Sequence, residues 1–220
     1  MRSLYESLFD IDDNIDNVDK SIKDQIKQFL NDNFTNVSKC KISEKPNKDG
    51  KFEVSSNSDV RVKNEQITSL TNGSFIWTYI KGEFNCFNCK SLISLEGAPK
   101  EVGGDFDCSY CKSLISLEGA SEKVGGDFYC NYCDSLKSLE GAPKEVSGDF
   151  SCSWCNLLKS LEGAPKKVGR SFYCNNCNSL ISLEGAPKEV RGEFNCAKCG
   201  RYFTQEDVEK VSNVKGIIYV

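Results

Sequence analysis

The strongest constraint on the fold is a 22-residue segment that recurs along the chain without any change of step. Copies resembling GEFNCFNCKSLISLEGAPKEVG begin at Gly82, Gly104, Gly126, Gly148 and Arg170, and a shortened copy begins at Gly192. Self-similarity at a fixed period of this length is the signature of a solenoid, because one short repeat cannot bury its own apolar side. The sequence therefore predicts a stack of coils, each covering the apolar side of the next.

The residue pattern within a copy predicts one short strand per coil. Phe84 and Cys86 are two residues apart, so both side chains leave the same face of a strand. A second cysteine follows at Cys89, where the chain must leave the strand, and leucines spaced by three then return to the interior. Gly-Ala-Pro turns the chain in most copies, Val102 re-enters the core, and the recurring glycines and prolines exclude a long helix.

This pattern, F-x-C-x-x-C-x-x-L-x-x-L, resembles the leucine-rich repeat core L-x-L-x-x-N/C-x-x-L in its cysteine-containing variant. The resemblance covers roughly residues 59–203. The sequence SLEGAPKEVGGDF and the N-terminal segment SLYESLFD also resemble leucine-rich-repeat proteins encoded by tailed bacteriophages of gut bacteria. The resemblance implies an α+β solenoid with short parallel strands on a concave side and a mostly irregular convex side.

The flanks predict caps over the two ends of the solenoid. Residues 1–58 should form an N-terminal cap with an amphipathic helix over 20–34 and strands at KCKIS and KFEVSS. Residues 59–203 should form the solenoid, with Val62 replacing the first cysteine in a degenerate first coil. Residues 204–220 should form a C-terminal cap, in which a helix starts at Thr204 and is stopped by Gly216 before a last strand.

The 13 cysteines allow three interpretations: buried thiols, zinc ligands and disulfides. CxxC pairs separated by eighteen residues have the spacing of zinc sites, and Cys196 and Cys199 resemble a zinc knuckle. However, each first cysteine alternates with a core phenylalanine, and Val62 shows that a coil needs no sulfur there. Zinc also requires four ligands around one centre, whereas stacked coils supply unbroken rows. We expect a ladder of buried thiols without a cofactor, with zinc binding or disulfides as the alternatives.

The outward positions of the strands predict a binding surface. The residues beside the core Phe and Cys positions include an aromatic set and an acidic edge. The aromatic set is Tyr110, Tyr129, Tyr132, Trp154 and Tyr173, and the acidic edge is Asp105, Asp127 and Asp149. Tyrosine and tryptophan give large contact area at low entropy cost, which suits protein recognition. The alternative is that aromatic residues merely suit exposed strands.

Composition narrows the function class to a non-catalytic binding scaffold. The chain has no histidine, and its carboxylates repeat with the coils instead of converging on a pocket. A net charge of −4 disfavours nucleic acid and favours a basic protein or peptide as partner. The resemblance suggests a phage factor that binds a host protein. A structural or virion-associated phage protein and a zinc-dependent nucleic-acid module are the alternatives.

The first residues predict neither export nor metal binding. MRSLYESLFDIDDNID lacks the basic region and apolar stretch of a signal peptide, and no run reaches the roughly 20 apolar residues of a membrane span. We therefore expect a cytoplasmic protein. Asp10, Asp12, Asn14 and Asp16 mimic the start of a calcium loop, but Ile15 occupies the glycine position and the closing glutamate is absent. A solvated acidic stretch is the expectation.

Overall fold

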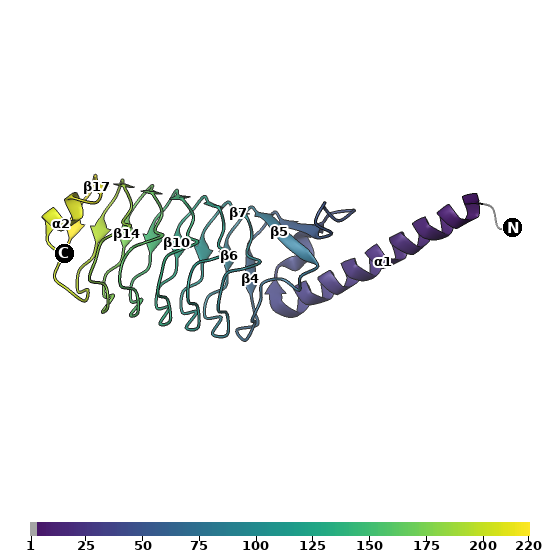
Figure 1. Cartoon of the computed structure of the whole chain (residues 1–220), viewed down its shortest axis with the longest axis horizontal. Coiled ribbons are helices and arrows are strands. Elements are labelled where there is room, and N and C mark those ends of the chain that lie inside the picture. The colour runs from purple at the N-terminus through teal and green to yellow at the C-terminus, as the bar shows by residue number, and fades with distance from the viewer. Residues whose placement is uncertain (1–3) are drawn as a thin grey trace.

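The chain forms a β-solenoid of about eight stacked turns (Figure 1). The computed structural model describes the backbone from Leu4 and the side chains from Asn17 to Val220. The signal-peptide and calcium-loop expectations concern side chains that lie outside the described residues. Two sheets of nine strands each run along the solenoid, and nearly all of their strands are parallel neighbours from successive coils.

The first sheet contains the predicted Phe-x-Cys strands. It is built from β4 (Val60–Val62), β6 (Phe84–Asn85), β8 (Phe106–Asp107), β10 (Phe128–Tyr129), β12 (Phe150–Ser151), β14 (Phe172–Tyr173) and β16 (Phe194–Asn195), with β1 (Phe34–Thr35) and β18 (Ile218–Tyr219) at its edges. Phe128 pairs with Phe106 on one side and Phe150 on the other, so the sequence period is also the pairing register. Only β1 is antiparallel to its neighbour in this sheet.

The second sheet was not predicted as a continuous sheet. Its strands are β2 (Cys40–Ile42), β3 (Phe52–Ser56), β5 (Phe75–Ile80), β7 (Glu101–Val102), β9 (Lys123–Val124), β11 (Glu145–Val146), β13 (Lys167–Val168), β15 (Glu189–Val190) and β17 (Asn213–Val214). The strands predicted at KCKIS and KFEVSS are confirmed as β2 and β3. The sequence placed Val102 in the core, but a two-residue strand is too short to show alternation.

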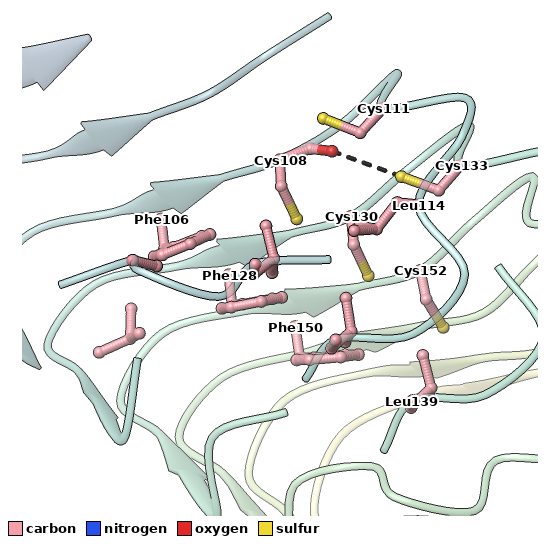
Figure 2. Close-up of a cluster of buried hydrophobic side chains, with 14 of the residues drawn as sticks. Phe106, Cys108, Cys111, Leu114, Phe128, Cys130, Cys133, Leu139, Phe150 and Cys152 are labelled. Atoms are coloured by element: carbon pink, nitrogen blue, oxygen red, sulfur yellow. Dashed lines mark hydrogen bonds between the residues drawn. The ribbon is translucent and has the colours of Figure 1, made fainter. Parts of the chain in front are cut away.

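The core consists of continuous rows of identical side chains, one row for each apolar position of the coil (Figure 2). Phe106, Phe128 and Phe150 stack with ring centroids 5.0 and 5.3 Å apart and nearly parallel planes. Cys108 and Cys130 beside them are fully buried, which confirms that the first cysteine of each coil points inward. The apolar side of each coil is thus covered by its neighbours, as the repeat requires.

One glycine per coil is imposed by close packing of the backbone. Gly141, in the SLEG turn, has φ of +91°, and a Cβ atom there would lie 2.4 Å from the amide nitrogen of Glu118 in the preceding coil. Both the left-handed backbone and the lack of space exclude a side chain. The equivalent glycines Gly119, Gly163 and Gly185 have the same geometry.

A long helix precedes the solenoid and leaves it at an angle (Figure 1). Helix α1 (Leu4–Asn33) covers the predicted 20–34 segment except Phe34, which belongs to β1, and it begins much earlier. Its last turns are attached to the solenoid: Ile26 and Leu30 are buried, and the ring of Phe29 lies 5.9 Å from that of Phe75. The one-turn helix η1 (Val37–Lys39) then leads into β2. Among the described residues, no helix is long and apolar enough to cross a bilayer.

The C-terminal segment differs from the expectation in the length of its helix. Helix α2 (Gln205–Glu209) starts at the predicted residue, where Thr204 and Asp207 form a capping box. It ends at Glu209 instead of continuing to Gly216, because residues 213–214 pair with β15 as strand β17. The predicted last strand is confirmed as β18, which pairs in parallel with β16.

Candidate functional site

Three of the five predicted aromatic residues form one stacked row at the turn that follows each strand of the first sheet. Tyr110 and Tyr132 have ring centroids 4.5 Å apart, and those of Tyr132 and Trp154 are 5.5 Å apart, with nearly parallel planes in both pairs. Phe87 extends the row at one end, 5.1 Å from Tyr110. We call these four residues the aromatic turn row. Phe87 and Trp154 are exposed, whereas the two tyrosines are half-buried.

The backbone under this row is left-handed. Tyr110, Tyr132 and Trp154 have φ of 61°, 57° and 63°, while their amides still donate to carbonyls of the next coil. The equivalent position holds asparagine in two other coils, at Asn88 and Asn176, and lysine in the last coil, at Lys198. Asparagine adopts this conformation readily, whereas for a bulky residue it is strained by about 1–2 kcal/mol. The three central coils thus place aromatic residues where the backbone favours a small polar one.

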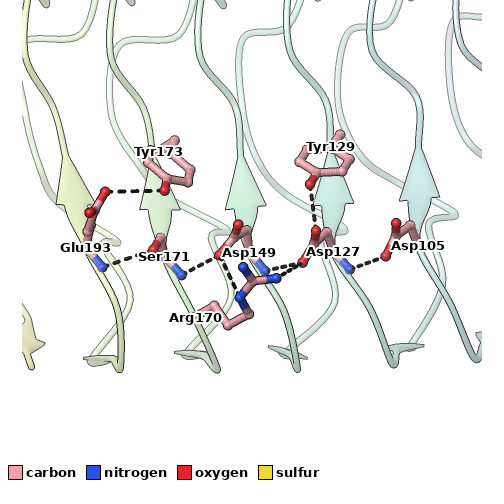
Figure 3. A network of polar contacts seen from close by, with 8 residues as sticks. All are labelled: Asp105, Asp127, Tyr129, Asp149, Arg170, Ser171, Tyr173 and Glu193. Atoms are coloured by element: carbon pink, nitrogen blue, oxygen red, sulfur yellow. Dashed lines mark hydrogen bonds and ion pairs between the residues drawn. The ribbon is translucent and has the colours of Figure 1, made fainter. Parts of the chain in front are cut away.

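Tyr129 and Tyr173 are placed differently, on strands β10 and β14 in alternate coils (Figure 3). The Tyr129 hydroxyl donates to Oδ2 of Asp127 at 2.6 Å, and that of Tyr173 donates to Oε2 of Glu193 at 3.4 Å. Within residues 17–220, no ring pair connects these two tyrosines to the aromatic turn row. Burial, assisted by the hydrogen bond to Asp127, raises the pKa of Tyr129.

The acidic residues form a ladder of contacts between coils (Figure 3). Oδ1 of Asp105 accepts from the amide of Asp127 at 2.8 Å, and Oδ1 of Asp127 accepts from the amide of Asp149 at 2.7 Å. Asp149 and Ser171 continue the pattern toward the C-terminus. We call Asp105, Asp127 and Asp149 the carboxylate ladder, which the Ser171 hydroxyl extends by one coil. Each member holds the main chain of the following coil, a role that the recurrence of aspartate before phenylalanine could have indicated.

The carboxylate ladder presents little free charge to a partner. Asp127 and Asp149 expose only 16% and 15% of their side chains, and Arg170 lies 3.7 Å from both. The sequence interpretation missed Arg170, which stands where the other coils have glycine before the strand. The acidic edge therefore joins the main chains of successive coils as much as it adds negative charge to the surface.

The cysteines form two rows of free thiols along the core. The thiol of Cys133 donates to the carbonyl oxygen of Cys108 at 3.3 Å (Figure 2), and the same contact recurs at Cys155, Cys177 and Cys199. Burial raises the pKa of Cys130 and Cys152 well above the usual value for a thiol. Because the thiolate is the form that binds metal or attacks a substrate, these cysteines are held in an unreactive form.

The described residues contain no group of three or more cysteine or carboxylate side chains placed to hold a metal ion. Cys199, at the end of the second row, is the exception in its acidity: a hydrogen bond from the Cys174 thiol lowers its pKa. It is also only partly buried, as is Cys40. The CxxC spacing thus follows from the coil, in which the second thiol reaches the main chain of the preceding turn.

A second exposed apolar row, absent from the sequence interpretation, lies on another part of the coil. Ile93, Ile115 and Ile181 expose 58%, 48% and 57% of their surface. Lys137 and Lys159 occupy the two intervening coils, so this row is interrupted by charge. The aromatic turn row is therefore the longer uninterrupted apolar feature, because it spans four successive coils.

No family model, curated protein or solved structure matches the chain.

Proposed function

We propose that the protein is a non-catalytic scaffold that binds another protein through the aromatic turn row. One observation carries the proposal: three successive coils hold Tyr110, Tyr132 and Trp154 in a left-handed backbone that Asn88 and Asn176 fill without strain. Strain retained at bulky, partly exposed side chains is a mark of functional surfaces, since folding alone would favour asparagine there.

The orientation of the rings favours a protein partner. Tyr132 lies between the nearly parallel rings of Tyr110 and Trp154, so both of its faces are covered and its ring edge is left for contact with a partner. Nucleic-acid bases and sugars are bound by stacking on free aromatic faces. Edges and phenolic hydroxyls instead suit apolar side chains and main-chain groups, as in protein interfaces. The net charge of −4 favours a partner of basic character.

The finer identity is also part of the proposal. We infer that the solenoid is of the leucine-rich-repeat type and that the protein is a phage factor that engages a host protein. The recurring F-x-C-x-x-C-x-x-L-x-x-L pattern and the sequence SLEGAPKEVGGDF support this inference. The described geometry is consistent with a solenoid that presents a protein-binding surface on one side of its coils.

The test is affinity capture from bacterial extract with the intact protein and a variant that combines Tyr132→Asn with Trp154→Asn. Asparagine is the residue that the neighbouring coils carry at this position, so the fold is retained. The matched control combines Ile93→Asn with Ile115→Asn, which removes exposed apolar side chains elsewhere. A partner retained by the intact protein and control but lost by the first variant supports the proposal. Equal recovery of every partner by all three proteins contradicts it.

A further inference from the structure

The sequence of α1 carries a feature that the binding surface does not use. Apolar residues recur with alternating spacings of four and three. They are Leu4, Leu8, Ile11, Ile15, Val18 and Ile22. This is the heptad period of a coiled coil, with Leu8, Ile15 and Ile22 at a positions and Leu4, Ile11 and Val18 at d positions. A helix that packs on a globular core instead follows a period of about 3.6 residues.

The structure places most of the α1 backbone away from the solenoid, although Ile22 at the end of the stripe packs against the core. The backbone of α1 is continuous from Leu4 to Asn33, yet only its last turns reach the coils, and the rest projects away (Figure 1). Val18 exposes 53% of its surface, whereas Ile26 is fully buried against the solenoid. A helix of 30 residues is about 45 Å long, and most of the stability of a helix in a protein comes from packing of its amphipathic face. We therefore expect the apolar stripe to pack against another helix.

We propose that α1 joins two further copies of the same chain in a parallel, in-register, three-stranded coiled coil. The stripe is self-complementary, because a and d positions are apolar over about three heptads. β-Branched residues occupy both kinds of position, as in Ile11, Ile15 and Val18, and this favours three strands over two. Identical helices meeting at one seam need no other partner.

The charges beside the stripe set the direction of the helices. Asp12 and Asp19 fall at e positions, and the uncharged Ser7 and Asn14 fall at g positions. Parallel helices pair g with e, which places Asp12 opposite Ser7 and Asp19 opposite Asn14. Antiparallel helices would pair e with e and bring aspartates together. The acidic residues also disfavour a lipid surface, because interfacial helices carry lysine and arginine on their polar face.

The first test is the native mass of the full chain by light scattering after gel filtration. We expect about three times the chain mass of 24.5 kDa. Combining Ile11→Asp with Val18→Asp should give the monomer mass, because the stripe then carries charge. The matched control combines Phe9→Asp with Asn17→Asp, which adds the same charge at b and c positions and should stay trimeric. Circular dichroism checks that the solenoid remains folded in both variants.

A monomeric intact protein would overturn the proposal, as would an oligomer of unchanged mass in the Ile11→Asp, Val18→Asp variant. A dimer that this variant dissociates would keep the coiled coil and overturn the three-stranded state. Direction is tested by Val18→Cys under mild oxidation, because only parallel, in-register helices bring two copies of residue 18 together. We expect a disulfide-linked pair there and none from Asn17→Cys; the absence of a link at residue 18 overturns the parallel arrangement.

Discussion

Raising the pH should destabilise this protein at a lower pH than most other proteins, because its core contains rows of thiols. Burial raises the pKa of Cys108, Cys130 and Cys152 well above the usual range, and the same holds for Cys174, where the hydrogen bond with Cys199 adds to burial. In the unfolded chain these thiols ionise with a pKa of about 8.5. Stability linked to a raised pKa is fully present below the unfolded value and is lost as the pH rises beyond it.

The magnitude follows from this proton balance. Consider a thiol that stays protonated in the native state and has a pKa near 8.5 in the unfolded state. Between pH 8 and pH 9.5, it lowers the free energy of unfolding by about 1.3 kcal/mol. The four fully buried first cysteines from Cys108 to Cys174 together give about 5 kcal/mol. Folded domains have only about 5–15 kcal/mol in total, so mild alkali should remove a large part of the protein's stability.

The assay is urea unfolding at a series of pH values, with reductant present to keep the thiols free. Because tyrosine and lysine also titrate in alkali, a matched variant is needed, combining Cys130→Val with Cys152→Val. Val62 fills the equivalent position of the first coil, so valine fits the strand. The variant should lose about 2.5 kcal/mol less than the intact protein over the same pH interval, since two of the four thiols are gone.

Only the difference in pH dependence matters here, because valine can change the stability at pH 7 by repacking alone. Parallel curves for the two proteins between pH 8 and pH 9.5 would refute the reasoning. They would mean that the buried thiols ionise as easily in the folded chain as in the unfolded one.

Three further predictions follow from the rows of contacts between coils. Replacing Phe128 by alanine should lower the free energy of unfolding by about 3–5 kcal/mol, measured by urea unfolding, because the ring is fully buried in the stack; a loss near zero would contradict the phenylalanine ladder. Asp127→Ala should cost about 1–3 kcal/mol by removing the acceptor for the Asp149 amide, whereas the exposed Asp134→Ala should change stability by less than about 0.5 kcal/mol. Native protein treated with an alkylating reagent should be modified only at the partly exposed Cys40 and Cys199, as counted by mass spectrometry; rapid labelling of the remaining thiols without denaturant would show that the core opens.

The fixed repeat step made the first sheet predictable from the sequence. Once residue i is known to face residue i+22, the inward Phe128 and Cys130 define a strand and its register, as the pairing of Phe128 with Phe150 confirms. The second sheet could not be inferred, because pairs such as Glu101 and Val102 give no alternation to detect. The early start of α1 could have been predicted, because its apolar stripe is visible in the sequence from Leu4 onward.

The candidate surface was predictable only in part. The stacking of Tyr110, Tyr132 and Trp154 follows from their equal positions in successive coils. Their left-handed backbone does not, although the asparagines at two equivalent positions were a signal for it. Placing Tyr129 with this row overlooked its position on the strand, three residues before the turn. The aspartates were interpreted as surface charge, because a sequence does not show that a carboxylate accepts main-chain amides from the next coil.

Because all central coils pair in the same register, the length of the solenoid can change by whole coils. Phe106, Phe128 and Phe150 pair with one another in the same way, so a chain lacking residues 128–149 would place Phe106 against Phe150 without any other adjustment. The same deletion would bring Tyr110 onto Trp154 and shorten the solenoid by one strand spacing, about 4.8 Å. Recombination between near-identical repeats in the gene could thus lengthen or shorten the protein by whole coils, and the number of rings in the row would change in step with it.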